Sequence, residues 1–127
     1  MRLAARAGFS LLELFVVLLI IAILTAVEVT RIHDYKHHYY QATMLSDLRN
    51  LAVSEESYWS SVDTYTNDLT ALNYTPTPQV TITFVEADSV GWSAKAAHAN
   101  DTTTCAVYYG RAAILAPATA KTVIGCN

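Results

Sequence analysis

The feature that most constrains this chain is a run of apolar residues close to its N-terminus. The run covers residues 9–27, and Glu13 is the one charged residue in it. A helix needs about 20 such residues to cross the hydrocarbon core of a bilayer. Arg2 and Arg6 precede the run, and no basic residue follows it until Arg31. The positive-inside rule therefore predicts a transmembrane helix whose N-terminus lies in the cytoplasm, with the rest of the chain outside.

The run differs from an ordinary secretory signal. Such signals have a shorter apolar core with a small-residue cleavage site after it. Here the run is long, and no clear Ala-x-Ala site follows it. A candidate processing site lies before the run instead, at Ala7-Gly8-Phe9. Cleavage between Gly8 and Phe9 would remove residues 1–8 as a leader peptide and leave the hydrophobic helix on the mature protein.

Glu13 stands about one turn inside the apolar run. A carboxylate within a membrane helix costs about 2.5–3.5 kcal/mol on insertion scales, so such a residue usually has a partner and a function. Cleavage before Phe9 would create an α-amino group there. The amine of a neighbouring subunit is a natural counter-charge for Glu13. The alternative is a charge that is tolerated because it lies near the membrane surface.

These residues resemble a known motif. The sequence around the candidate site reads Gly8-Phe9-Ser10-Leu11-Leu12-Glu13-Leu14. It is similar to the prepilin cleavage and methylation motif of type IV pilins and pseudopilins. The resemblance implies that a prepilin peptidase cuts after Gly8 and methylates the new N-terminal Phe9. It also implies that Glu13 neutralises the amino terminus of an adjacent subunit during assembly.

The resemblance implies a structural role and no enzymatic activity. The chain would be a subunit of a type IV pilus or pilus-like filament, which is a helical homopolymer. Its partners would be the prepilin peptidase, the pilus assembly machinery and, before assembly, the bacterial inner membrane. The assembled filament would be extracellular or periplasmic. Three alternatives stay open: a pseudopilin of a type II secretion system, a minor pilin for adhesion or DNA uptake, and a single-span anchored protein that never polymerises.

The motif covers about the first quarter of the chain. A more general similarity extends through the helix to a C-terminal loop bounded by cysteines. Two positions depart from the pattern of many major pilins, which have a proline where this chain has Thr30 and often a glycine where it has Ala22. The first proline of this chain is Pro76. Pseudopilins and minor pilins often lack the same two residues, so the departures weaken the assignment to the major pilins.

The helix is predicted to continue beyond the membrane. Residues 28–62 carry apolar and aromatic side chains at helical spacing, and no glycine or proline interrupts residues 9–61. We therefore expect one continuous helix of about 50 residues, or roughly 75–80 Å at 1.5 Å per residue. Its second half would pack on the globular body. The stripe comprises Ile32, Tyr35, Tyr39, Met44, Leu48, Leu51, Tyr58 and Val62.

Residues 63–127 are predicted to form the globular body. The segment 63–78 is expected to be a loop, because Pro76 and Pro78 exclude a helix. Alternating and β-rich segments then predict antiparallel strands, which gives an α+β fold in which the long helix packs on a small sheet. The strands are expected at residues 80–85, 92–98 and 105–109, with a short edge strand at 123–125. The side chains expected to face the helix from the first strand are Val80, Ile82 and Phe84.

Cys105 and Cys126 are the only cysteines of the chain. An even pair beside an export-type N-terminus predicts a disulfide formed in an oxidising compartment. The alternative is a pair of buried free thiols. A bridge would close a loop of about 20 residues and would stabilise the fold by about 3 kcal/mol in the chain-entropy model.

Composition and motifs argue against several other functions. The net charge is −3 and no basic stripe is present, which disfavours nucleic-acid binding. His33 and His37 have a spacing that can ligate a metal, but no cysteine or suitable carboxylate set accompanies them. No nucleophile elbow, His-Glu-x-x-His motif or phosphate loop occurs. We therefore expect no metal, no cofactor and no catalytic site.

Overall fold

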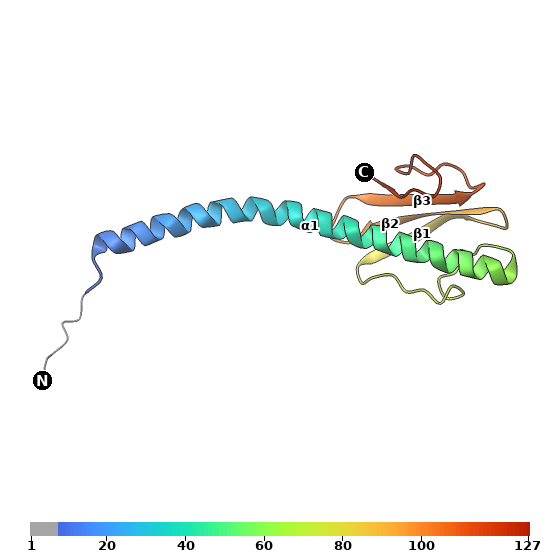
Figure 1. Cartoon of the computed structure of the whole chain (residues 1–127), viewed down its shortest axis with the longest axis horizontal. Helices are drawn as coiled ribbons and strands as arrows, with labels where there is room; N and C mark the ends of the chain where they lie inside the picture. Colours follow the sequence, from blue (N-terminus) through green and yellow to red (C-terminus); the bar gives the residue numbers. More distant parts are fainter. Residues whose placement is uncertain (1–7) are drawn as a thin grey trace, which may run out of the picture. The chain divides into compact units, whose positions relative to one another are not determined.

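A computed structural model describes residues 8–127 of the chain. Figure 1 shows one long helix followed along the chain by a sheet. The elements are α1 (Leu11–Val62), β1 (Val80–Ala87), β2 (Gly91–His98), β3 (Thr104–Gly110) and β4 (Gly125–Cys126). The chain forms two compact units, and the sequence boundary between them lies after Lys36, within α1. The prediction of an α+β fold with a long N-terminal helix and an antiparallel sheet is confirmed.

Helix α1 begins two residues later than the sequence predicted. The N–H of Leu14 donates to the carbonyl of Ser10 at 3.1 Å, which makes Ser10 the N-cap residue. At the other end, the N–H of Asp63 donates to the carbonyl of Trp59 at 2.8 Å, and Asp63 itself has a φ of 57°. A left-handed residue directly after a helix ends it. Between these two ends the helix runs for 52 residues without a glycine or proline.

The sheet is antiparallel, with the strand order β1-β2-β3-β4. Strand β1 extends to Ala87, two residues further than expected, because a bulge between Phe84 and Glu86 accommodates Val85 and the pairing then resumes. Strand β4 is shorter and lies later than expected. The N–H of Val123 donates to the carbonyl of Ala120 in a turn, so the pairing starts only at Gly125.

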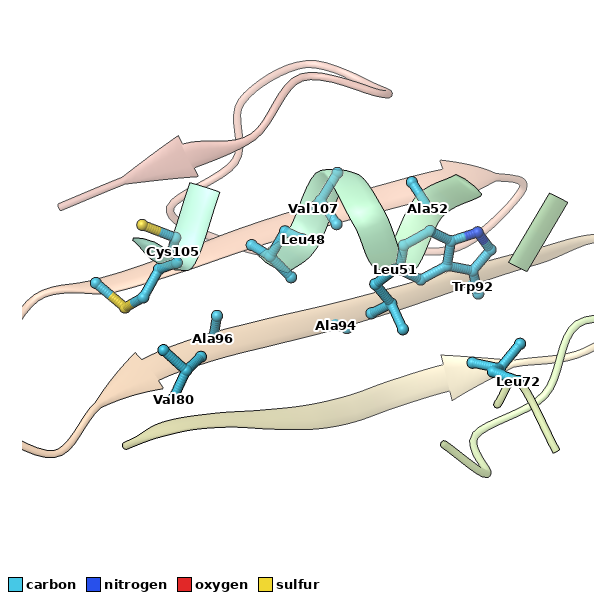
Figure 2. Close-up of a cluster of buried hydrophobic side chains, with 11 residues drawn as sticks. Leu48, Leu51, Ala52, Leu72, Val80, Trp92, Ala94, Ala96, Cys105 and Val107 are labelled. Carbon is cyan, nitrogen blue, oxygen red and sulfur yellow. The ribbon is translucent and has the colours of Figure 1, made fainter. Parts of the chain in front are cut away.

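The main core lies between the second unit's part of α1 and one face of the sheet. Figure 2 shows Leu48 and Leu51 of α1 pointing toward Trp92 and Val107 on the central strands. These four side chains are completely buried. Each large side chain buried in this way contributes about 1.5–3 kcal/mol to folding. The face of α1 that carries Leu48 therefore holds the helix and sheet together.

Alanines on the central strand β2 allow α1 to pack closely against the sheet. Ala94 and Ala96 are completely buried beneath the helix, where a larger residue would hold it away. The ring of Trp92 stacks on that of Tyr109 at 4.9 Å with an interplanar angle of 5°. As expected, Val80 of β1 belongs to this core, and Ile82 and Phe84 pack against it while only partly buried.

The opposite face of the sheet has a second, smaller core. Ala106 and Tyr108 of β3 pack there with Ala112 and Ala118, and Leu115 lies against them partly buried. These partners come from the segment between β3 and β4, for which the sequence predicted little. The segment covers the second face of the sheet, which explains why β2 and β3 are buried on both sides.

The predicted disulfide is present. Cys105 of β3 and Cys126 of β4 are bonded, and the two residues are also directly opposite each other in the strand pairing. Because β4 has only two residues, its own ladder is short. The covalent bond therefore supplements this short ladder and the hydrogen bonds between Asn127 and Thr104 in holding the C-terminus to the rest of the body.

Breaking this bridge is expected to lower the free energy of unfolding of the body by about 3 kcal/mol, because the denatured chain regains the freedom of a loop of 21 residues. The measurement is urea unfolding of the full chain in detergent, followed by tryptophan fluorescence, with and without a reductant. A double Cys105→Ala/Cys126→Ala variant should match the reduced wild type and should not respond to the reductant. Equal midpoints for the oxidised and reduced wild type would contradict this expectation.

Candidate processing and assembly site

The bond predicted to be cut lies in an exposed, irregular segment. Gly8, Phe9 and Ser10 precede α1 and have no regular secondary structure, and 81% of the surface of Phe9 is exposed. A Cβ atom added to Gly8 would meet nothing within 4 Å. The described part of the chain therefore sets no steric demand for glycine here. Any preference for glycine at this position must come from a molecule that binds the bond.

Glu13 caps its own helix. Its Oε2 accepts a hydrogen bond from the backbone N–H of Ser10 at 3.0 Å. This is one half of a capping box, in which the third residue of a helix satisfies the amide of the N-cap residue. The Ser-x-x-Glu spacing that signals such a box is visible in the sequence, although the expectation for Glu13 rested on its charge alone. The carboxylate thus has a local structural role in addition to any intermolecular one.

The cap leaves part of the Glu13 carboxylate uncommitted. The side chain is exposed, and among the described residues only Ser10 N–H donates to it, through Oε2. An ionised carboxylate has about four acceptor positions on its two oxygens. Oε1 can therefore accept a charged donor without loss of the cap. Glu13 lies in the first turn of α1 and Phe9 precedes that turn. The structure records no hydrogen bond between them, and the nitrogen of Phe9 is here a peptide nitrogen.

The first unit exposes an unbroken apolar surface. From Leu11 to Val27, the large apolar side chains are between 45% and 85% exposed. The hydroxyl of Thr25 donates to the carbonyls of Ile21 and Ala22, so this polar group is satisfied by the helix itself. Helix α1 is long and apolar enough to cross a membrane. Exposure of so much apolar surface to water is unfavourable, so lipid or other helices would have to cover it.

One of the histidines of α1, His37, contacts an aspartate of the globular body. Nδ1 of His37 lies 3.0 Å from Oδ2 of Asp101, which belongs to the turn between β2 and β3. Burial acts to raise the pKa of Asp101, but the hydrogen bond from the N–H of Thr103 and the charge of His37 outweigh it and hold that pKa below its usual value. Within residues 8–127, no group of three or more potential metal ligands gathers.

A hollow of about 410 Å³ lies beside α1 near its C-terminal end. No histidine lines it, and the hydroxyls of Ser54 and Ser61 donate to backbone carbonyls of the same helix. Among the described residues that line the hollow, none is a base that could activate these serines as nucleophiles. The lining residues are Val53, Ser54, Ser57, Tyr58, Ser61, Ala71 and Leu72.

No family model and no curated protein matches this chain. The described residues at the N-terminus provide an accessible Gly8–Phe9 bond, a carboxylate with a free oxygen and an apolar helix surface that no described residue covers.

Two buried acids in the body were not singled out from the sequence. Asp47 and Glu55 both lie on α1 and are 3% and 0% exposed. Asp47 accepts hydrogen bonds from Tyr74 and Thr77, and Glu55 accepts one from Thr66. For Glu55 a signal existed, because it follows Leu51 at the spacing of the buried stripe. For Asp47 the sequence held no such signal, since its donors lie about 30 residues away in a loop.

Proposed function

We propose that this chain is a structural subunit of a type IV pilus or a related filament. Residues 1–8 would be removed by a prepilin peptidase in the inner membrane, and Phe9 would become the methylated N-terminus. The mature subunit would then polymerise through α1. The observation that carries the proposal is the arrangement at the helix start: an accessible bond after Gly8 directly precedes a capped apolar helix, whose capping residue Glu13 retains a free oxygen.

Cleavage would change the electrostatics of the helix start. The new α-amino group of Phe9 would add a positive charge to the positive end of the helix dipole. In an apolar filament core an unpaired charge of this kind is expensive, whereas a close pair with good hydrogen bonds is tolerated. The Oε1 atom of Glu13 on an adjacent subunit can accept from that amine while Oε2 keeps its bond to Ser10. The pairing would also align neighbouring helices in register.

A pseudopilin of a type II secretion system is the second candidate. The observation that favours it is the continuity of α1, which has no glycine or proline over its 52 residues. The two candidates differ in what is lost when the gene is removed. Loss of surface filaments would favour a pilin, and loss of protein export with normal filaments would favour a pseudopilin.

Processing is tested by mass spectrometry of the protein in material sheared from the cell surface. We expect a mature chain that begins at methylated Phe9 and is recovered in fibres. Gly8→Val is the matched variant, because the added side chain has open space around it and should leave the fold unchanged. It should keep its leader and stay in the membrane. An intact Met1 in the wild type, found only in the membrane fraction, would favour an anchored protein that does not polymerise.

A further inference from the structure

Glu55 is a buried carboxyl group with too few partners. It is completely shielded from solvent in the last third of α1. Oε2 accepts one hydrogen bond, from the N–H of Thr66 at 3.1 Å, and Oε1 is buried with no partner among the described residues. An ionised carboxylate in such a place is unfavourable, because it has lost water and gained only one donor.

Among the described residues, the charged group that shifts the pKa of Glu55 is the negative Glu56, while Arg49 shares a hollow with Glu56 and Tyr109 and does not pair with Glu55. Glu56 is its neighbour on α1, and Tyr65 faces it from the following loop. Asp88, in the turn between β1 and β2, accepts the N–H of Tyr65 through its carbonyl, and Tyr109 of β3 lies close enough to interact with Glu56. No lysine, arginine or histidine forms an ion pair with Glu55 in the described part of the chain. The surroundings thus favour its neutral form.

The same groups hold the loop that follows α1. The hydroxyl of Tyr65 donates to Glu56 at 3.1 Å, and the ring of Tyr65 lies 6.2 Å from that of Trp59. Together with the bond from Thr66 to Glu55, these contacts attach the segment 63–68 to the end of the helix. The shielding of Glu55 and the attachment of this segment therefore depend on each other.

We propose that Glu55 is a proton-operated latch for the segment 63–68. With a proton on Glu55, the carboxyl group is neutral and the segment closes over it. When the proton leaves, the buried charge draws the segment open so that water can reach it. The device works within the body, and it does not depend on whether the chain forms filaments.

The direction of the pH dependence follows from the burial. Desolvation raises the pKa of Glu55 from 4.5 to about 7, with the Thr66 N–H opposing the shift and the charge of Glu56 adding to it. A group whose pKa is raised in the closed state stabilises that state below its ordinary pKa, and this stabilisation disappears as the pH rises through about 7. The fraction of molecules with an open segment should rise about 70-fold between pH 5 and pH 8.

The test is hydrogen exchange of the full chain in detergent, read by mass spectrometry on peptides that cover residues 63–70. Protection factors, corrected for the intrinsic pH dependence of exchange, should fall about 70-fold from pH 5 to pH 8 in the wild type. Glu55→Gln should stay protected across this range, because its side chain cannot ionise. Glu56→Gln is the matched control and should keep most of the pH dependence.

A second measurement reads Glu55 directly. Carbon NMR of the wild-type side-chain carboxyl group should give a midpoint near pH 7, and it does not depend on the folding of any variant. A midpoint near the ordinary value of 4.5 would overturn the proposal. So would an equal loss of protection in the wild type and in Glu55→Gln between pH 5 and pH 8.

Discussion

Replacing Glu13 by glutamine is expected to leave the cleavage after Gly8 unaffected and to lower the yield of filaments at least about 100-fold. The amine of Phe9 would enter the filament core without a counter-charge. Leaving one member of a buried ion pair unpaired costs about 3–5 kcal/mol, and about 2.7 kcal/mol corresponds to a factor of 100. The yield is measured by shearing cells and quantifying the subunit in the fibre fraction, relative to the processed subunit in the membrane.

Glutamine is the informative replacement because Glu13 caps α1 in the structure and is also proposed to pair with the amine of a neighbouring subunit. Its Oε2 accepts the N–H of Ser10, and a glutamine amide oxygen can do the same in a capping box. Glu13→Gln therefore removes the charge and keeps the cap, whereas Glu13→Ala removes both. If the glutamine variant assembles and the alanine variant does not, then the cap matters and the charge does not. Normal filament yield from both variants would exclude the pairing of Glu13 with a neighbouring amine.

The main elements could be predicted because local patterns determine them. The absence of glycine and proline over residues 9–61 predicted a single helix, and the alternation after Val80 predicted the first strand. The starts of α1 and β4 were misplaced, and in each case a specific hydrogen bond decides the boundary; the end of β1 was misplaced because pairing resumes after a bulge. Ser10 accepts from Leu14 and so caps α1, and Val123 donates to Ala120 in a turn that delays β4.

The parts that could not be predicted depend on contacts between distant residues. The Ala-rich segment after β3 has little periodicity, yet Ala112 and Ala118 fit into the second core because they are small. The burial of Asp47 likewise depends on a loop about 30 residues further along the chain. At the N-terminal site, the sequence motif predicted both the residues and their roles. The structure added that the bond is exposed and that Glu13 caps the helix, while the assembly role of Glu13 stays a prediction.

Asp47 attaches the loop between α1 and β1 to the helix. Its Oδ1 accepts from the hydroxyls of Tyr74 and Thr77, both at 2.9 Å, and its Oδ2 accepts from the N–H of Thr77 at 3.0 Å. Burial raises the pKa of Tyr74, and the hydrogen bond from its hydroxyl to Asp47 and the charge of Asp47 raise it further. The loop contains Pro76 and Pro78 and has no strand or helix of its own. Asp47 therefore takes the place of the backbone ladder that would otherwise hold such a segment.

Replacing Asp47 by alanine is expected to lower the free energy of unfolding of the body by about 3–5 kcal/mol. The change leaves the hydroxyl and the N–H of Thr77 without an acceptor in a shielded place, whereas the Tyr74 hydroxyl keeps the backbone carbonyl of residue 47 at 3.1 Å. Each unsatisfied buried donor costs about 1–3 kcal/mol. Asparagine should cost less than about 1.5 kcal/mol, which is the net value of one typical hydrogen bond. It can turn its oxygen to the N–H of Thr77 and donate its amide to the two hydroxyls, which accept as well as donate. Urea unfolding of the full chain in detergent measures both variants. Equal losses would show that the charge of Asp47, rather than its set of hydrogen bonds, stabilises the loop.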